Sequence, residues 1–95
     1  MNKSDEDKII NICRKNDVSM IGIFGSTARG EATASSDIDL LIKLSKPKSL
    51  LALVKLERNL SEAIGKKVDL LTEGASSPYL KGLILKELKV IYEAR

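Results

Sequence analysis

Aspartates in apolar stretches are the residues of this chain whose type and spacing could do chemistry. Asp37 and Asp39 lie two positions apart, at the start of the apolar residues 38–42. Asp69 lies inside a second apolar run, residues 68–71. Aspartate is depleted in strands, and burying a carboxylate is costly unless it is paired or bound to a metal. Three such residues on adjoining strands therefore suggest a site for divalent cations.

The spacing of these carboxylates suits a pair of magnesium ions. On a strand, Asp37 and Asp39 face the same side, roughly 6–7 Å apart. If Asp69 lies on a neighbouring strand and faces the same way, the three carboxylates converge and repel one another without cations. Magnesium prefers oxygen ligands and often shares its shell with substrate phosphates. Two ions about 4 Å apart can stabilise the attacking and leaving oxygens of phosphoryl or nucleotidyl transfer.

Each aspartate also has a structural explanation. Asp37 follows Ser36 and would suit a loop end or a helix cap. Asp69 would suit an exposed strand start, ion-paired with Lys66 or Lys67. The structural explanation is poorer for Asp39, because the apolar run continues beyond it. Together with the turn described next, the group favours a site.

A glycine–serine turn follows the apolar residues 20–24. Gly25 has no Cβ, so its backbone can approach a ligand closely. Ser26 offers a hydroxyl and, at a helix start, a free backbone N–H, which suits a phosphate. The turn has neither a Walker A nor a dinucleotide-binding pattern, and alone it is also an ordinary strand-to-helix turn. Arg29 can reach a phosphate or a site carboxylate, and a surface or structural ion pair explains it equally well.

Length and composition predict one small domain spanning residues 1–95. The chain is 43% hydrophobic but only 3% aromatic, so its core must consist mostly of leucine, isoleucine and valine. Its 16 basic and 13 acidic residues give a net charge of +3. The basic residues are scattered and no aromatic residues interleave them, so we expect no direct nucleic-acid partner.

The residue types that are scarce also exclude classes of function. The chain has no histidine, which excludes histidine-ligated zinc, a histidine base and a Ser-His-Asp triad. Its single cysteine, Cys13, cannot form an internal disulfide. No apolar run approaches the ~20 residues of a membrane span, and the charged N-terminus shows no secretory signal. We therefore expect a cytoplasmic protein with no membrane partner.

Hydrophobic periodicity predicts helices and strands in alternation. The expected helices are residues 5–16, a short helix from 26 to 29, a helix from Pro47 to Gly65, and one from Pro78 through Leu88; the expected strands are 20–24, 38–44, 67–71 and 90–92, with loops at 30–36 and 72–77. Ser4 is expected to cap the first helix. This order predicts an α/β (α+β) fold with a small mixed sheet of three to four strands covered by helices.

Apolar residues at helical spacing predict which helix faces are buried. In the first helix these are Ile9, Ile12 and Cys13, with Ile10 beside them. In the helix that follows Pro47, a broad apolar face contains Leu50, Leu51, Leu53, Val54, Leu60, Ala63 and Ile64. Both sets predict helices that pack on the sheet.

The sequence resembles the DNA polymerase β-like nucleotidyltransferase superfamily. The resemblance rests on Gly-Ser-x-Ala-Arg-Gly-Glu at residues 25–31 and Ser-Asp-Ile-Asp-Leu-Leu at 36–41, and it extends to residues 67–71 and 84–93. Leu88 departs from the pattern, because such tails often carry glycine there. Among the members, the chain is most similar to the minimal nucleotidyltransferases (MNT), the antitoxins paired with HEPN-domain toxins.

The resemblance implies roles for the site residues. It implies that Asp37 and Asp39 bind two Mg²⁺ ions. It also implies that Asp69 completes one metal shell and can take the proton from the acceptor hydroxyl. Gly25 and Ser26 would hold the triphosphate of ATP. The implied reaction moves AMP from ATP to a hydroxyl, typically a tyrosine on the HEPN toxin, and releases pyrophosphate.

The resemblance leaves two other functions open. The chain holds little beyond the catalytic core, so the acceptor surface is expected on a second protein, the HEPN toxin. One alternative is a catalytically inactive antitoxin that neutralises the toxin by binding alone. Another is a small-molecule nucleotidyltransferase of the antibiotic-modifying kind, against which the missing acceptor domain argues.

Overall fold

The computed structural model describes residues 3–25, 37–72, 82, 86 and 88–94. In chain order its elements are α1 (Lys3–Arg14), β1 (Val18–Phe24), β2 (Ile38–Leu44), α2 (Leu50–Ile64), β3 (Val68–Thr72) and β4 (Lys89–Glu93). The predictions for residues 26–36 and 73–77, and for the helix expected from Pro78, lie outside the described residues, apart from residues 82, 86 and 88.

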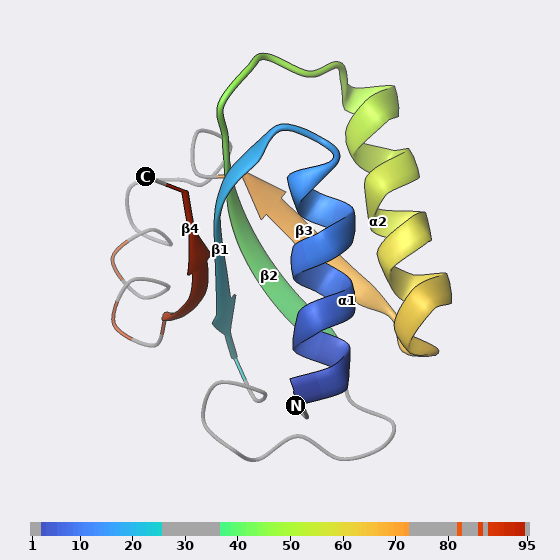
Figure 1. The fold of residues 1–95 in the computed structure, drawn as a ribbon, viewed down its shortest axis with the longest axis vertical. Helices are drawn as coiled ribbons and strands as arrows, with labels where there is room; N and C mark the ends of the chain where they lie inside the picture. Colours follow the sequence, from blue (N-terminus) through green and yellow to red (C-terminus); the bar gives the residue numbers. More distant parts are fainter. Residues whose placement is uncertain (1–2, 26–36, 73–81, 83–85, 87, 95) are drawn as a thin grey trace.

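The strands form one four-stranded sheet in the order β3-β2-β1-β4 (Figure 1). Strand β1 is antiparallel to both β2 and β4, whereas β2 and β3 are parallel. A parallel pair cannot be joined by a tight hairpin, and helix α2 supplies the crossover between β2 and β3. The predicted small mixed sheet covered by helices is therefore confirmed.

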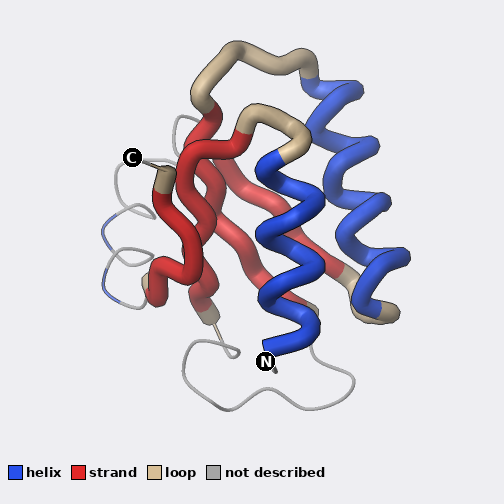
Figure 2. The backbone as a smooth tube through the Cα atoms, viewed as in Figure 1, coloured by secondary structure: helices blue, strands red, loops and turns tan. Residues whose placement is uncertain are grey.

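Helices α1 and α2 cover the same face of the sheet (Figure 2). The core between them consists of Ile9, Cys13, Val18, Ile21, Ile23, Ile38, Leu40, Ile42, Leu56, Leu60 and Val68. Alternate residues of β2, Ile38, Leu40 and Ile42, enter this core, because successive side chains of a strand point to opposite faces. The prediction for α1 is confirmed, since Ile9 and Cys13 are its buried residues.

The helix starts differ from the predictions. Helix α1 begins at Lys3, so Ser4 lies inside its first turn and the predicted cap is wrong. Helix α2 begins at Leu50 instead of Pro47, because Ser49 is its cap: the Ser49 hydroxyl accepts a bond of 3.2 Å from the N–H of Ala52.

The predicted end of α2 at Gly65 is confirmed. Gly65 adopts a left-handed φ of 70°, and its N–H donates to the carbonyl of Ser61. The expected apolar face of α2 is only partly buried. Leu60 enters the core, but Leu50, Leu51 and Val54 are 78%, 65% and 52% exposed, and the buried Leu56 was not among the predicted residues. Helical spacing gave the wrong face here because residues 50–54 are all apolar and offer no polar side to the first turns of α2.

Leu88 does not belong to a helix in the described structure and directly precedes β4. The prediction of a helix through Leu88 is wrong at that residue. A Cβ on Gly22 of β1 would run into the Leu88 side chain, so the two residues lie against each other. Because Gly22 has no side chain, there is room here for leucine. The predicted final strand is confirmed as β4.

Candidate active site

The candidate site lies on the face of the sheet opposite α1 and α2. In β2, Ile38 and Leu40 enter the core, so Asp39 between them projects from the opposite face. Strands β2 and β3 pair with Asp39 opposite Asp69. Partners in a parallel register project from the same face, so these two aspartates stand side by side on neighbouring strands.

Gly25 closes the site from the end of β1. Phe24, the last residue of β1, pairs with Asp39. Gly25 has a left-handed φ of 72°, and a Cβ built on it would lie 2.5 Å from Oδ2 of Asp39. Any side chain at residue 25 would therefore be strained and would push the Asp39 carboxylate away. The absence of a side chain at Gly25 makes room for this carboxylate.

Asp37 lies one residue before β2 and is exposed. The backbone beside it is fixed, because the N–H of Ile38 donates a bond of 2.9 Å to the carbonyl of Lys67. This bond ties the start of β2 to the start of β3. It leaves Asp37 at the same end of the strand pair as Asp39 and Asp69.

Asp69 is partly exposed and has a cationic neighbour. The Nζ atom of Lys67 lies 3.9 Å from Oδ1 of Asp69. Exposed pairs at this distance contribute little to stability. The ion pair proposed as the structural explanation of Asp69 is thus present, but it is too weak to account for an aspartate in this place.

The predicted meeting of all three carboxylates stays a prediction. Within residues 3–25, 37–72, 82, 86 and 88–94, no three Asp, Glu, His or Cys side chains gather closely enough to hold a metal ion as they stand. Carboxylates without a cation repel one another, so the backbone register is the stronger guide to the site. Ser26 and Arg29 lie outside the described residues.

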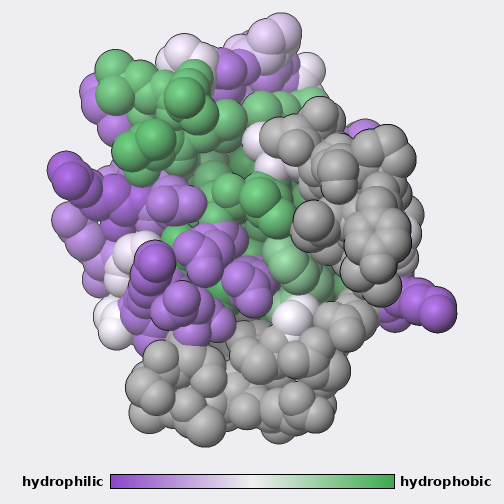
Figure 3. All heavy atoms as spheres, turned by 180° about the vertical axis from the view of Figure 1, so that it is seen from behind, coloured by the Kyte–Doolittle hydropathy of each residue, from purple (hydrophilic) through white to green (hydrophobic). Residues whose placement is uncertain are grey.

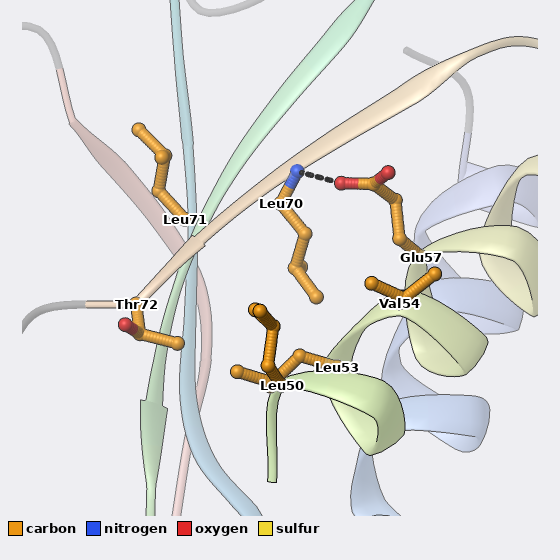
Figure 4. A pocket seen from close by; sticks show the side chains of 7 residues that line it. All are labelled: Leu50, Leu53, Val54, Glu57, Leu70, Leu71 and Thr72. Carbon is orange, nitrogen blue, oxygen red and sulfur yellow. Dashed lines mark hydrogen bonds between the residues drawn. The ribbon is translucent and has the colours of Figure 1, made fainter. Parts of the chain in front are cut away.

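Two polar residues that the sequence did not point to support the site from α2. Oε2 of Glu57 accepts a bond of 3.0 Å from the N–H of Leu70 (Figure 4). Oγ of Ser61 accepts one of 3.0 Å from the N–H of Val68. These bonds flank Asp69 on both sides. Their spacing of four residues on one helix was the available signal, but it has meaning only once α2 is known to lie along β3.

An apolar groove continues beyond Glu57, between the start of α2 and the end of β3. It is lined by Leu50, Leu53, Val54, Glu57, Leu70, Leu71 and Thr72 (Figure 4). Figure 3 shows hydrophobic side chains gathered over the N-terminal part of α2, at the upper left of that view. Among the described helices, none combines the length and apolarity needed to cross a membrane.

The chain is similar to known nucleotidyltransferases over most of its length. The model of the family Polymerase beta, Nucleotidyltransferase matches residues 7–95. A protein of Methanocaldococcus jannaschii, named as a candidate protein adenylyltransferase, is 49% identical over 80 residues, which are 84% of this chain and 86% of the relative.

Solved structures of toxin–antitoxin pairs have the same fold. One is a crystal structure of a toxin–antitoxin with AMP-PNP: the TM-score is 0.85 at 27% identity, over 95% of this chain and 74% of that chain. Another holds a tri-AMPylated Shewanella oneidensis HEPN toxin in complex with an MNT antitoxin: the TM-score is 0.81 at 25% identity, over 99% and 74%. With the family model matched from residue 7 to residue 95, this chain belongs to the polymerase beta nucleotidyltransferase family.

Proposed function

We propose that the protein is a magnesium-dependent adenylyltransferase that moves AMP from ATP to a hydroxyl of a HEPN toxin and so acts as its antitoxin. The observation that carries the proposal is the register that sets Asp39 beside Asp69, with Gly25 against the Asp39 carboxylate. The relatives support the acceptor, because the solved pairs include an AMPylated HEPN toxin bound to an MNT antitoxin.

The residues present fit a magnesium site. Asp39 and Asp69 offer oxygen ligands from neighbouring strands, and the missing side chain at Gly25 makes room for the Asp39 carboxylate. Asp37 and Asp39 would hold two Mg²⁺ ions, and Asp69 would complete one shell. When bound, the ions neutralise negative charge on the carboxylates and on the triphosphate of ATP.

In the proposed reaction, the acceptor hydroxyl oxygen bonds to the α-phosphorus of ATP. The bond from that phosphorus to the oxygen bridging to the β-phosphorus breaks, and pyrophosphate leaves. Asp69 takes the hydroxyl proton and then passes it to water. Gly25 and Ser26 hold the triphosphate, and Arg29 contacts a phosphate or a site carboxylate. Catalysis then depends mainly on positioning and on charge neutralisation.

The partner and the location follow from this chemistry. The acceptor is a tyrosine hydroxyl on the HEPN toxin, so the toxin supplies the acceptor surface. The donor is ATP, and the proposal therefore places the protein in the cytoplasm. This proposal involves neither a nucleic-acid partner nor a membrane.

The test is transfer of labelled AMP to a HEPN toxin encoded beside this protein, with ATP and Mg²⁺ present. We expect label on the toxin with the unchanged protein, and none with the double variant Asp37→Asn/Asp39→Asn. The matched control is Asp7→Asn, since Asp7 is an exposed residue of α1 outside the candidate site. This control should transfer AMP as the unchanged protein does.

Toxin activity measured in the same samples separates the remaining functions. If the double variant still neutralises the toxin and no label is transferred by the unchanged protein, the protein is an antitoxin that acts by binding. If label appears only on an added small-molecule alcohol, the acceptor is not the toxin. Either result contradicts the proposal.

A further inference from the structure

Strand β3 is an edge strand that is nevertheless bound on both sides. Its inner side pairs with β2, and Asp69 sits opposite Asp39 in that ladder. On its outer side, the N–H groups of Val68 and Leu70 donate to Ser61 and Glu57 of α2. Backbone N–H groups of alternate residues point to the same edge of a strand, so Asp69 lies between two anchored neighbours.

The spacing of helix and strand explains why these two side chains reach the strand. Four residues of an α-helix rise about 6 Å, and two residues of a strand extend about 6.6 Å. Ser61 faces Val68, and Glu57, one turn earlier, faces Leu70. The residue one turn before Glu57 is Leu53, where the apolar groove begins and the polar contacts give way to apolar ones (Figure 4).

Of the two acceptors, Ser61 is held by further hydrogen bonds. The Ser61 hydroxyl donates a bond of 2.9 Å to the carbonyl of Glu57 while it accepts from Val68, so both of its roles are used. The Ser61 carbonyl accepts from the N–H of Gly65, which holds the end of the helix. Glu57 is partly buried, and an ionised carboxylate is a strong acceptor for a backbone N–H.

We infer that Glu57 and Ser61 are positioning residues for Asp69. From α2 they hold the outer edge of β3, so that the Asp69 carboxylate stays beside that of Asp39. The inference rests on the proposed function, in which Asp69 is the third metal ligand. Residues that orient a ligand from behind commonly change metal affinity 10–100-fold when they are replaced.

The experiment compares Glu57→Ala with Glu57→Gln. Alanine removes the acceptor for the Leu70 N–H, whereas glutamine keeps a side-chain carbonyl in its place. The probe is Mn²⁺ binding by the protein alone, together with hydrogen exchange of the Leu70 amide. The matched control is Glu62→Ala, an exposed glutamate of the same helix.

We expect Glu57→Ala to weaken Mn²⁺ binding about tenfold. The Leu70 amide should exchange faster in this variant, while Glu57→Gln and Glu62→Ala stay close to the unchanged protein. Ser61→Ala should likewise speed exchange of the Val68 amide and weaken Mn²⁺ binding. It replaces Glu57→Ala in the experiment if that variant does not fold.

Faster exchange at Leu70 with unchanged Mn²⁺ binding would overturn the inference, because Glu57 would then only stabilise the strand edge. Asp69→Asn separates this failure from failure of the proposed function. If Asp69→Asn loses Mn²⁺ and AMP transfer while Glu57→Ala keeps both, the site is real and the positioning role is wrong. If even the unchanged protein transfers no AMP to a toxin, the proposed function fails. The inference is then still tested by comparing Mn²⁺ binding of Glu57→Ala with that of the unchanged protein.

Discussion

The two faces of strand β2 are built from adjacent residues but have different surroundings. On the face covered by α1 and α2, Ile38, Leu40 and Ile42 are buried in the core. On the other face, Asp39 is partly exposed and lies beside Gly25 and Asp69. Because strand side chains alternate, one residue stabilises the fold while its neighbour is available for chemistry. Substitutions on the core face should therefore lower mainly stability, and substitutions on the other face should lower mainly activity.

The largest expected effect belongs to the face opposite α1 and α2. Asp39→Asn keeps the shape of the side chain but removes a charge, so AMP transfer should fall about a thousandfold, ~4 kcal/mol of transition-state stabilisation. The free energy of unfolding should change by less than ~0.5 kcal/mol, as for most surface substitutions. Transfer kinetics and urea unfolding of the same sample measure both. A large loss of stability would show that the two faces are not independent.

The neighbouring residue should behave in the opposite way. Leu40 is completely buried, and Leu40→Ala should lower the free energy of unfolding by ~3 kcal/mol through lost burial and a cavity. The fraction that remains folded should transfer AMP at the normal rate. Urea unfolding gives the stability, and transfer per folded molecule gives the activity. Leu50→Ala is the control, because Leu50 is exposed and should lose little stability.

Replacing glycine by alanine should have a smaller effect. Comparing two such variants distinguishes the cost of backbone strain from an effect on the candidate site. Gly25 and Gly65 have similar left-handed φ values of 72° and 70°, so alanine at either should cost about 1 kcal/mol. A Cβ on Gly65 meets nothing within 4 Å, whereas one on Gly25 meets the Asp39 carboxylate. Only Gly25→Ala should therefore also reduce AMP transfer. Equal AMP transfer by the two variants would show that Gly25 is not part of the site.

The last effect concerns the helix-covered face and is absent at neutral pH, because it appears only above pH 9. Burial raises the pKa of the Cys13 thiol from 9.0 to about 12. The unfolded chain releases this proton above pH 9, so the contribution of Cys13 to stability is complete below pH 9 and is lost as the pH rises toward 12. Each pH unit in this range should cost about 1.4 kcal/mol.

Urea unfolding at pH 8 and pH 10 checks this expectation. Other groups also titrate in this range, so the difference between the unchanged protein and Cys13→Ala isolates the thiol. The difference should shrink by about 1.4 kcal/mol from pH 8 to pH 10. A constant difference would mean that Cys13 becomes exposed in the folded protein.

Local features of the fold could be read from the sequence. The limits of β2 match the predicted residues 38–44, and helix α2 ends at Gly65 as expected. These features depend on neighbouring residues: alternating or continuous apolar runs, and a glycine that can take a left-handed φ. The start of α2 was misplaced because Ser49 and Pro47 are both plausible helix starts, and the hydrogen bond that decides between them appears only in the structure.

The candidate site required both kinds of information. The sequence by itself determined the acidic residues, their spacing on a strand and the glycine before Ser26, because residue type and the two-residue period of strands are local. Only the tertiary structure decided that Asp69 is the register partner of Asp39, and that Glu57 and Ser61 flank it. Asp39 and Asp69 are far apart in the chain, and their pairing depends on how all the strands and helices bury their apolar faces together.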